Sequence, residues 1–321
     1  ITGIVWTAKW FSQANLSVIR ATPNVGAILL IGVGVIFIGK LGAKKLGAML
    51  LGLGIFWSGN ALLGKDQLNF GEFNIAMLDV GQGLAVVVTT RQHVLVYDFG
   101  PRFGDFSLGE AVVLPHILGE NLSNIDAAVL SHGANDHVGG FPAVADQFEI
   151  RRQFSGDPKA VEGISCHTLP QPNWTWDGVD FTFLNSRPAN VRNENDFSCV
   201  LQIKGEHGSA LLTGDIEMAA EAALVKRYGM GLSTDVLQIP HHGSKTSSTN
   251  SFLKATSPDY ALLSRGRRNR FRHPSREVIN RYDIEQIHIW DTAKEGQIDL
   301  QSTGRGWEGR TFSAASARFW H

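Results

Sequence analysis

Two histidines and an aspartate follow an apolar run near the middle of the chain, a combination that suits metal chemistry. The run spans 125–130 and is followed at once by His132, Asp136 and His137, with Gly-Gly at 139–140. Imidazole and carboxylate groups are the ligands with which proteins hold hydrolytic transition metals. The three side chains are spaced too tightly to share one helical face, so a loop at a strand end has to bring them together. Taken alone, the cluster could be a solvated loop with stray histidines.

Two later segments carry the same types of side chain at the ends of apolar runs. Asp215 follows the run 209–213, and His241 and His242 follow the run 235–239. Glycine stands beside each of the three groups, which allows tight turns. Loops at strand ends are where such folds gather binding residues. Three groups of this kind therefore predict one shared metal site much more specifically than one group does.

Composition bounds the size and class of the protein. The chain has 321 residues, is 43% hydrophobic and 18% charged, and has a formal net charge of −1. This is enough for one large domain and an accessory segment. Because the net charge is near zero, nucleic-acid binding has to rest on local patches. Cys166 and Cys199 could form a bridge, but we favour two free buried thiols because their sequence contexts are unrelated.

Residues 1–66 differ from the rest and are predicted to form a transmembrane helical segment. Positions 21–39 and 46–64 carry no charge and are rich in Leu, Ile, Val and Gly, each stretch being 19 residues long. This is close to the length that spans a bilayer; a buried helical pair in a soluble protein is the alternative. Three lysines between the stretches predict a cytoplasmic loop and an extracytoplasmic domain after it. The first residue is Ile1 rather than Met, which suggests a fragment of a longer protein.

Residues 67–321 are predicted to form an α/β (α+β) domain. Apolar runs typical of strands occur at 73–78, 85–90, 93–98, 125–130, 164–169, 179–184, 198–204, 209–213, 235–239, 260–264 and 284–290, with a final hairpin at 297–312. Helical stretches at 108–118 and 216–228, and another after Pro274, alternate with these runs. Strands that alternate with helices, with strand pairs interspersed, predict two mixed sheets with helices outside them.

Five motifs of this domain form a combination that is more specific than any one of them. They are Leu78-Asp79-Val80-Gly81-Gln82-Gly83, Tyr97-Asp98-Phe99-Gly100, the segment from Ser131 to Gly140, Leu212-Thr213-Gly214-Asp215-Ile216-Glu217, and Pro240-His241-His242-Gly243-Ser244. In this combination the chain resembles the metallo-β-lactamase superfamily, and more closely the soluble domain of ComEC-type DNA-uptake (competence) channel proteins. The resemblance covers about Phe73 to the end and implies a four-layer αββα sandwich. The preceding hairpin resembles the end of that family's channel region.

The resemblance implies a metal-dependent nuclease that degrades one strand of incoming DNA while the other strand passes through the channel. Two divalent ions about 3.5–4 Å apart can activate water and stabilise the leaving oxygen of a phosphodiester. One or two ions, Mn2+ or Zn2+, would be held by His132, Asp136, His137, Asp215 and His242. A carboxylate can bridge two ions, so Asp215 is the expected bridge, and Asp136, Asp215 and His241 are the expected catalytic residues. We favour His242 over His241 as the ligand, with His241 closer to the substrate.

Two positions depart from the family's pattern. Ala134 stands where relatives have His or Asp, and a methyl group cannot bind a metal ion. The ion held by His132 therefore lacks a ligand, for which Asn195, Asp196 and Ser198 are weak substitutes. The departure leaves three readings open: reduced activity, an inactivated or engineered variant, or a degenerate domain that only binds DNA. Leu84 replaces a small polar or acidic residue. Asp79 and Asp98, at strand ends, are expected to orient loops or ligating histidines.

A basic segment follows the strand 260–264. Six arginines occur in the twelve residues 265–276, with Phe271 available for base stacking, which is a local signature of phosphate binding. A solvated loop, or one that faces anionic lipid, is the alternative. Ser244 and Lys245 could donate to a phosphate or could instead cap the helix near Ser251. The predicted DNA-binding residues are Arg265, Arg267, Arg268, Arg270, Arg272, His273, Ser244 and Lys245.

The leading hypothesis is therefore a metal-dependent deoxyribonuclease module of a DNA-uptake channel. The channel is expected to be a multi-pass protein of the cytoplasmic (inner) membrane of a bacterium. The module's expected partners are single- or double-stranded DNA, the membrane, the rest of the channel and, as an open alternative, a second copy of the chain. The second hypothesis is a catalytically impaired DNA-guiding domain, and the third is a metallo-hydrolase for a small ester, lactone or phosphodiester. The chain has no Gly-x-Ser-x-Gly elbow and no P-loop, which disfavours a serine hydrolase and a nucleotide-binding P-loop protein.

Overall fold

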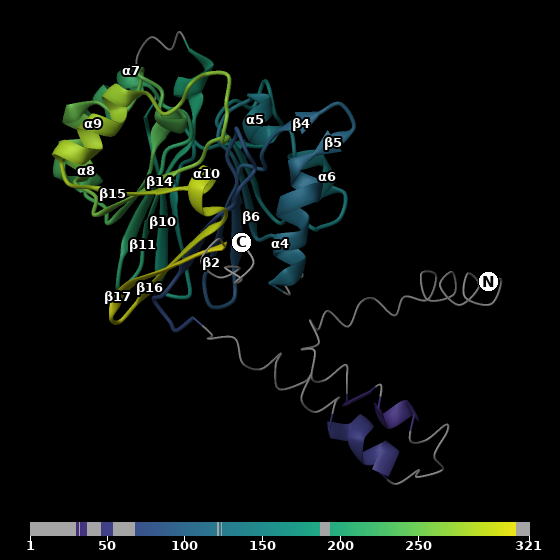
Figure 1. Cartoon of the computed structure of the whole chain (residues 1–321). Helices are drawn as coiled ribbons and strands as arrows, with labels where there is room; N and C mark the ends of the chain where they lie inside the picture. Colours follow the sequence, from purple (N-terminus) through teal and green to yellow (C-terminus); the bar gives the residue numbers. More distant parts are fainter. Residues whose placement is uncertain are drawn as a thin grey trace. The chain divides into compact units, whose positions relative to one another are not determined.

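The computed structural model describes residues 30–31, 33–36, 46–53, 68–120, 122, 124–186 and 193–312. The chain divides into two units, Ile1–Gln67 and Leu68–His321 (Figure 1). The boundary predicted after residue 66 falls outside the described residues and stays a prediction.

The first unit has helical backbone at 30–31, 33–36 and 46–53. Within these described residues, no helix is long and apolar enough to cross a membrane. Most of the two predicted spans, 21–39 and 46–64, lies outside the described residues, as does the hairpin loop between them. The transmembrane hairpin is therefore not confirmed.

The second unit contains an eight-stranded mixed sheet with the order β17-β16-β1-β2-β3-β6-β7-β8. Its strands run antiparallel from β17 to β3 and parallel from β3 to β8. The bounds are β1 (Asn74–Met77), β2 (Val86–Thr89), β3 (Val94–Tyr97), β6 (Ala127–Leu130), β7 (Gln153–Ser155), β8 (Ile164–Ser165), β16 (Ile298–Thr303) and β17 (Gly306–Thr311). A small hairpin of β4 (Arg102–Phe103) and β5 (Phe106–Ser107) leaves this sheet after β3.

A second sheet has seven strands in the order β15-β14-β13-β12-β11-β10-β9. Strands β9 to β12 pair antiparallel, whereas β12 to β15 pair parallel. The bounds are β9 (Asn173–Trp176), β10 (Val179–Leu184), β11 (Val200–Lys204), β12 (Ser209–Leu212), β13 (Val236–Gln238), β14 (Tyr260–Leu263) and β15 (His288–Asp291). The two mixed sheets that the strand and helix pattern predicts are thus observed.

Helices cover the outer face of each sheet (Figure 1). On the eight-stranded sheet they are η1 (Gly109–Val113), α4 (Leu114–Gly119) and α6 (Phe141–Ala145), and on the seven-stranded sheet α7 (Met218–Tyr228), α8 (Asn250–Thr256) and α9 (Arg276–Ile284). Strand β3 shows why four layers form. Leu95 and Tyr97 point into the core between the sheets, and Val94 and Val96 point into the core under the helices. Because alternate side chains face opposite sides of a strand, a strand that is apolar throughout needs both faces covered.

Cys166 and Cys199 form a disulfide bond, so the prediction of two free thiols is wrong. Cys166 follows β8 of one sheet, and Cys199 precedes β11 of the other. Both side chains lie in the core between the sheets, where face-to-face packing brings their Cα atoms to 5.8 Å from each other. The unrelated sequence contexts gave no sign of this contact because sheet packing alone creates it.

We expect reduction of this disulfide to lower the free energy of unfolding by about 2–4 kcal/mol, because the bridge restricts the unfolded chain. The measurement is urea denaturation of the full chain with and without dithiothreitol, alongside a count of titratable thiols. The Cys166→Ser/Cys199→Ser double variant is the control, since its unfolding midpoint should not respond to the reductant. Two reactive thiols in the unreduced native protein would contradict the bridge.

Candidate metal centre

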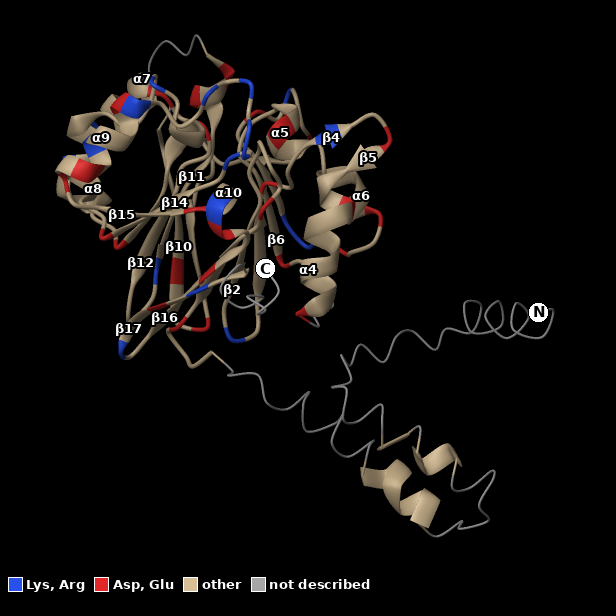
Figure 2. Ribbon diagram, in the orientation of Figure 1, with Lys and Arg blue, Asp and Glu red and all other residues tan. Residues whose placement is uncertain are grey.

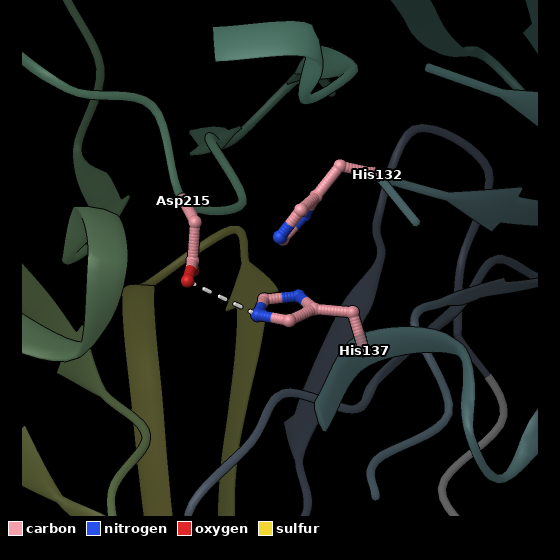
Figure 3. Close-up of side chains that lie close together, drawn as sticks. All are labelled: His132, His137 and Asp215. Atoms are coloured by element: carbon pink, nitrogen blue, oxygen red, sulfur yellow. Dashed lines mark ion pairs between the residues drawn. The ribbon is translucent and has the colours of Figure 1, made fainter. Parts of the chain in front are cut away.

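The loops that follow β6, β12 and β13 bring their imidazole and carboxylate groups to one place. His132, His137 and Asp215 form one group, and Asp136, His137 and His242 form a second; within each group the ligand atoms lie within 4.8 Å of one another. The sequence-predicted ligands are therefore gathered together. Figure 3 shows the side chains of the first group pointing toward one another.

The two groups share His137 and are joined by close charge contacts. His137 Nε2 lies 3.2 Å from Asp215 Oδ2 (dashed in Figure 3), and His242 Nε2 lies 3.5 Å from the same oxygen. His242 Nε2 also lies 3.6 Å from Asp136 Oδ2. Asp215 is thus in reach of both groups, which is the central position that a bridging ligand requires.

Four buried atoms of this cluster form no hydrogen bond: Nε2 of His132, His137 and His242, and Oδ1 of Asp215. Burial of a polar atom without a hydrogen bond is costly, and natural structures contain few such atoms. Three imidazole nitrogens and a carboxylate oxygen are also a donor set that suits Zn2+ or Mn2+. The residues present therefore fit a divalent cation.

Hydrogen bonds on the far side of two rings aim their Nε2 atoms at the cluster. Asp98 lies 2.6 Å from His137 Nδ1 and accepts from both the backbone N–H and the hydroxyl of Ser131 at 2.7 Å. His242 Nδ1 lies 2.9 Å from the carbonyl oxygen of Ser264. A proton on each Nδ1 leaves the Nε2 lone pair free for a metal. Asp98 thus makes the contact that its predicted orienting role requires.

His241 and His242 occupy different places, although they are adjacent in sequence. Both have left-handed backbone, with φ of 50° and 52°, in the turn η4 (Pro240–Gly243). His242 is buried, whereas the His241 side chain is 22% exposed and lies 3.2 Å from Glu217 Oε1 through Nδ1. His241 Nε2 is 3.8 Å from Asp215, and His241 belongs to neither ligand group. The sequence offered no role for Glu217 beyond its place in a motif.

Opposite charges inside the cluster offset the burial of its carboxylates. Burial by itself raises the pKa of Asp136, but the close contact with the His242 imidazole and the nearby His137 lower it to about 2. The pKa of Asp215 also stays well below its usual range, because His137 and His242 outweigh burial. Burial and the neighbouring His137 lower the pKa of His132 to about 4. At neutral pH the two carboxylates are thus ionised and His132 is neutral, which are the states that bind metals.

The Gly81-Gln82-Gly83 loop packs closely against the backbone of the loop that carries Asp136. A Cβ on Gly83, whose φ is +153°, would lie 2.4 Å from the backbone oxygen of Asp136. The N–H of Leu84 donates to that same oxygen at 3.1 Å, and the Leu84 side chain packs in the core between the sheets. Glycine is therefore required where the two loops meet, and the apolar departure at Leu84 serves packing.

The side of the centre around Ala134 has no substitute ligand among the described residues. Ala134 precedes α5 (Asn135–Val138) and offers only a methyl group. Asp196 accepts from the N–H of Glu217 at 2.9 Å, and Ser198 Oγ accepts from the N–H of Asp215 at 3.0 Å. Asn195 Nδ2 donates to Glu217 at 3.2 Å. These three side chains hold the neighbouring loops by hydrogen bonds, and Asp196 belongs to neither ligand group.

The predicted DNA-binding residues divide into paired and exposed ones. Arg265 donates to Asp291 through Nη2 at 2.7 Å and Nε at 3.1 Å, so its guanidinium is held within the domain. Ser244 is buried and bonds Thr246, and Thr249 rather than Ser244 or Ser251 caps α8. The exposed residues are Arg267, Arg268, Arg270, Arg272 and Lys245. We call residues 265–276, which lie between β14 and α9, the arginine loop. In Figure 2 the blue of Lys and Arg marks the ribbon of this loop.

The fold and this site define the class of protein. The model of the metallo-beta-lactamase superfamily matches residues 78–267, and the chain belongs to that superfamily. The chain is 37% identical to competence protein ComA of Neisseria gonorrhoeae over 73% of this chain and 33% of that protein. It is 31% identical to recombination protein 2 of Haemophilus influenzae, over 72% of this chain and 29% of that protein. It is 26% identical to ComE operon protein 3 of Bacillus subtilis, over 73% of this chain and 34% of that protein.

These matches confirm the resemblance that the five motifs indicate. The chain spans about a third of the length of these curated relatives. The superfamily's fold implies a divalent-metal site, and the two ligand groups lie within the matched residues.

We expect Asp98→Asn to weaken binding of a divalent cation about 10- to 100-fold, because the amide is a weaker acceptor for His137 Nδ1. Titration calorimetry of the full chain with Zn2+ is the measurement. Asp79→Asn is the matched control, since the Asp79 carboxylate accepts from the nearby N–H of Gly81, at 3.2 Å. Equal affinity in Asp98→Asn and the unchanged protein would show that the carboxylate does not support a ligand.

Proposed function

We propose that this chain contributes the metal-dependent nuclease domain of a DNA-uptake (natural transformation) system. The observation that carries the proposal is the set of buried, unpaired ligand atoms on His132, His137, His242 and Asp215. The exposed arginines of the arginine loop supply a phosphate-binding surface for a polyanion. The names of two relatives, competence protein ComA and ComE operon protein 3, support DNA uptake as the process.

Each residue of the centre then has a role. One or two divalent cations would be held by His132, Asp136, His137, Asp215 and His242. When bound, such a cation lowers the pKa of water and neutralises charge on a phosphodiester. Asp98 and the Ser264 carbonyl hold the ligating rings. His241, oriented by Glu217 at the exposed side of the cluster, contacts the substrate.

The location that we propose is a bacterial cytoplasmic membrane, with residues 68–321 on its extracytoplasmic face. The two uncharged stretches at 21–39 and 46–64 support the membrane part. The Cys166–Cys199 disulfide supports the orientation, because such bonds persist in oxidising compartments and are rare in the cytosol.

A second candidate function is a DNA-guiding domain that binds DNA without cleaving it. Ala134 favours this candidate, because it removes a ligand from one side of the centre, and among the described His, Cys, Asp and Glu residues only His137 and Asp215 join His132 in a ligand group. A hydrolase for a small ester or lactone fits less well, because pockets for small substrates need few charges and the arginine loop exposes several.

Incubation of the full chain with single- and double-stranded DNA separates these functions. We expect cleavage in the presence of Mn2+ or Zn2+ and none with excess chelator, because the cluster is the only proposed source of an activated water. Product length on a denaturing gel is the readout, and binding is followed by fluorescence anisotropy. Binding without cleavage under every metal condition would replace the nuclease with the guiding domain.

We expect Ala134→Asp to raise both the number of bound metal ions and the rate of DNA cleavage, because it restores a carboxylate to the loop between His132 and Asp136. Metal content by mass spectrometry and initial cleavage rates are measured together. Ala134→Asn is the control, because asparagine has nearly the same shape as aspartate but carries no charge. A variant with unchanged metal content and rate would show that this loop does not ligate a second ion.

A further inference from the structure

We propose that Phe271 is a stacking platform for a nucleotide base and that it selects a single strand at the metal centre. The inference rests on the proposed function and names its substrate class more narrowly. Phe271 is 51% exposed at the tip of the arginine loop. An exposed aromatic ring among arginines offers a flat surface on which a base can stack while the phosphate beside that base pairs with a guanidinium.

Ring contacts connect Phe271 to the centre. Phe271 stacks on His273, with ring centroids 5.7 Å apart and planes 12° apart. His273 in turn meets His241 edge-on at 5.7 Å, and His241 lies beside Asp215 and Glu217. The platform is thus two ring contacts from a residue at the exposed side of the metal cluster. A strand with a phosphate at the centre has a neighbouring base within reach of Phe271.

The platform is held in place before any ligand binds. The side chain of Asn269 accepts from the N–H of His273 at 2.9 Å and donates to its carbonyl oxygen at 2.8 Å. The N–H of Ser275 donates to the oxygen of Gly243 at 2.9 Å, next to the ligand His242. A surface that is ordered in advance loses less entropy on binding. These bonds also fix the position of the platform relative to the ligands.

The Phe271 ring already attracts a flat cationic group. The Arg270 guanidinium lies over the Phe271 ring, 4.8 Å from its centroid. Arg270 is exposed, and a cation–π contact at an exposed site is weaker than the stacking of a base on an aromatic ring. An incoming base can therefore displace the guanidinium, which remains close enough to pair with the phosphate.

The same geometry disfavours intact duplex DNA. A base inside a duplex is stacked on its neighbours and has no free face for Phe271 unless it is flipped out at an energetic cost. A single strand offers unpaired bases at no such cost. The arginines bind either form through phosphates, so the preference for a single strand depends on the ring.

The test measures binding of the full chain to fluorescent oligonucleotides in excess EDTA, so that no substrate is cut. The probes are a single-stranded oligothymidylate, an abasic strand of the same length and phosphate number, and a blunt duplex. The unchanged protein should bind the oligothymidylate about 5- to 100-fold more tightly than the abasic strand, as expected for stacking of one base.

Variants separate stacking from general loop structure. Phe271→Leu keeps an apolar side chain but has no ring, and it should abolish the difference between the base-bearing and the abasic strand. Phe271→Tyr keeps the ring and should restore it. Phe70→Leu is the matched control: Phe70 is 65% exposed but packs against Gly178, at the turn between β9 and β10. That turn lies at the opposite end of the sheet from the metal loops, because β10 runs parallel to β12.

The outcomes distinguish this inference from the proposed nuclease. Equal binding of base-bearing and abasic strands by the unchanged protein, or an unaltered preference in Phe271→Leu, would overturn the platform even if the protein cuts DNA. If the unchanged protein binds base-bearing strands more tightly, Phe271→Leu abolishes this difference, and the protein never cuts DNA, the platform is supported and the nuclease is overturned. Absence of binding to all three probes would overturn the platform, while cleavage in the presence of Mn2+ or Zn2+ would still decide the nuclease.

Discussion

The burial of imidazole and carboxylate atoms without hydrogen-bond partners is the constraint on which the rest of this domain depends. Such atoms are costly in a protein interior, and four of them converge where the loops after β6, β12 and β13 meet. Attraction between Asp215 and the rings of His137 and His242 offsets part of the cost. A divalent cation would satisfy the remaining lone pairs. The atoms whose burial lowers the stability of the fold are therefore the ones that could hold a metal.

The surrounding structure keeps this cluster from relaxing. Asp98 and the carbonyl oxygen of Ser264 hold two rings from behind. The Gly81-Gln82-Gly83 loop packs against the backbone of Asp136, and Gln82 accepts from the N–H of Gly266 in the arginine loop at 3.2 Å. The loops that carry the ligands and the loop that carries the arginines are therefore parts of one connected arrangement. The exposed arginines and the buried imidazole and carboxylate cluster are in this way placed next to each other.

The centre is unequal on its two sides. Asp136, His137 and His242 offer a complete set of strong ligands on one side, supported by hydrogen bonds to their rings. On the other side, His132 has the methyl group of Ala134 as its neighbour in the loop, and Ser198 lies 3.4 Å from its Nδ1. Metal content is therefore the quantity that separates the two proposed functions.

The contacts of several residues depended on packing that no local pattern records. Arg265 belongs to the arginine run in sequence, yet Asp291 at the end of β15 holds its guanidinium. The predicted strand 284–290 starts too early, because Ile284, an apolar residue that is 77% exposed, ends α9 and β15 begins only at His288. Cys166 and Cys199 were predicted as free thiols, and they meet only because two sheets pack face to face.

The sequence by itself determined the two mixed sheets, the strand ends that carry ligands and the superfamily, because apolar periodicity and residue type at turns are local properties. Only the tertiary structure decided which of two adjacent histidines joins the cluster. A left-handed turn points His242 inward to Ser264 and leaves His241 beside Glu217. It also decided that Phe271, His273 and His241 stand in ring contact. Contacts between residues distant in sequence are set by how layers and loops pack, and one-dimensional patterns carry no information on that packing.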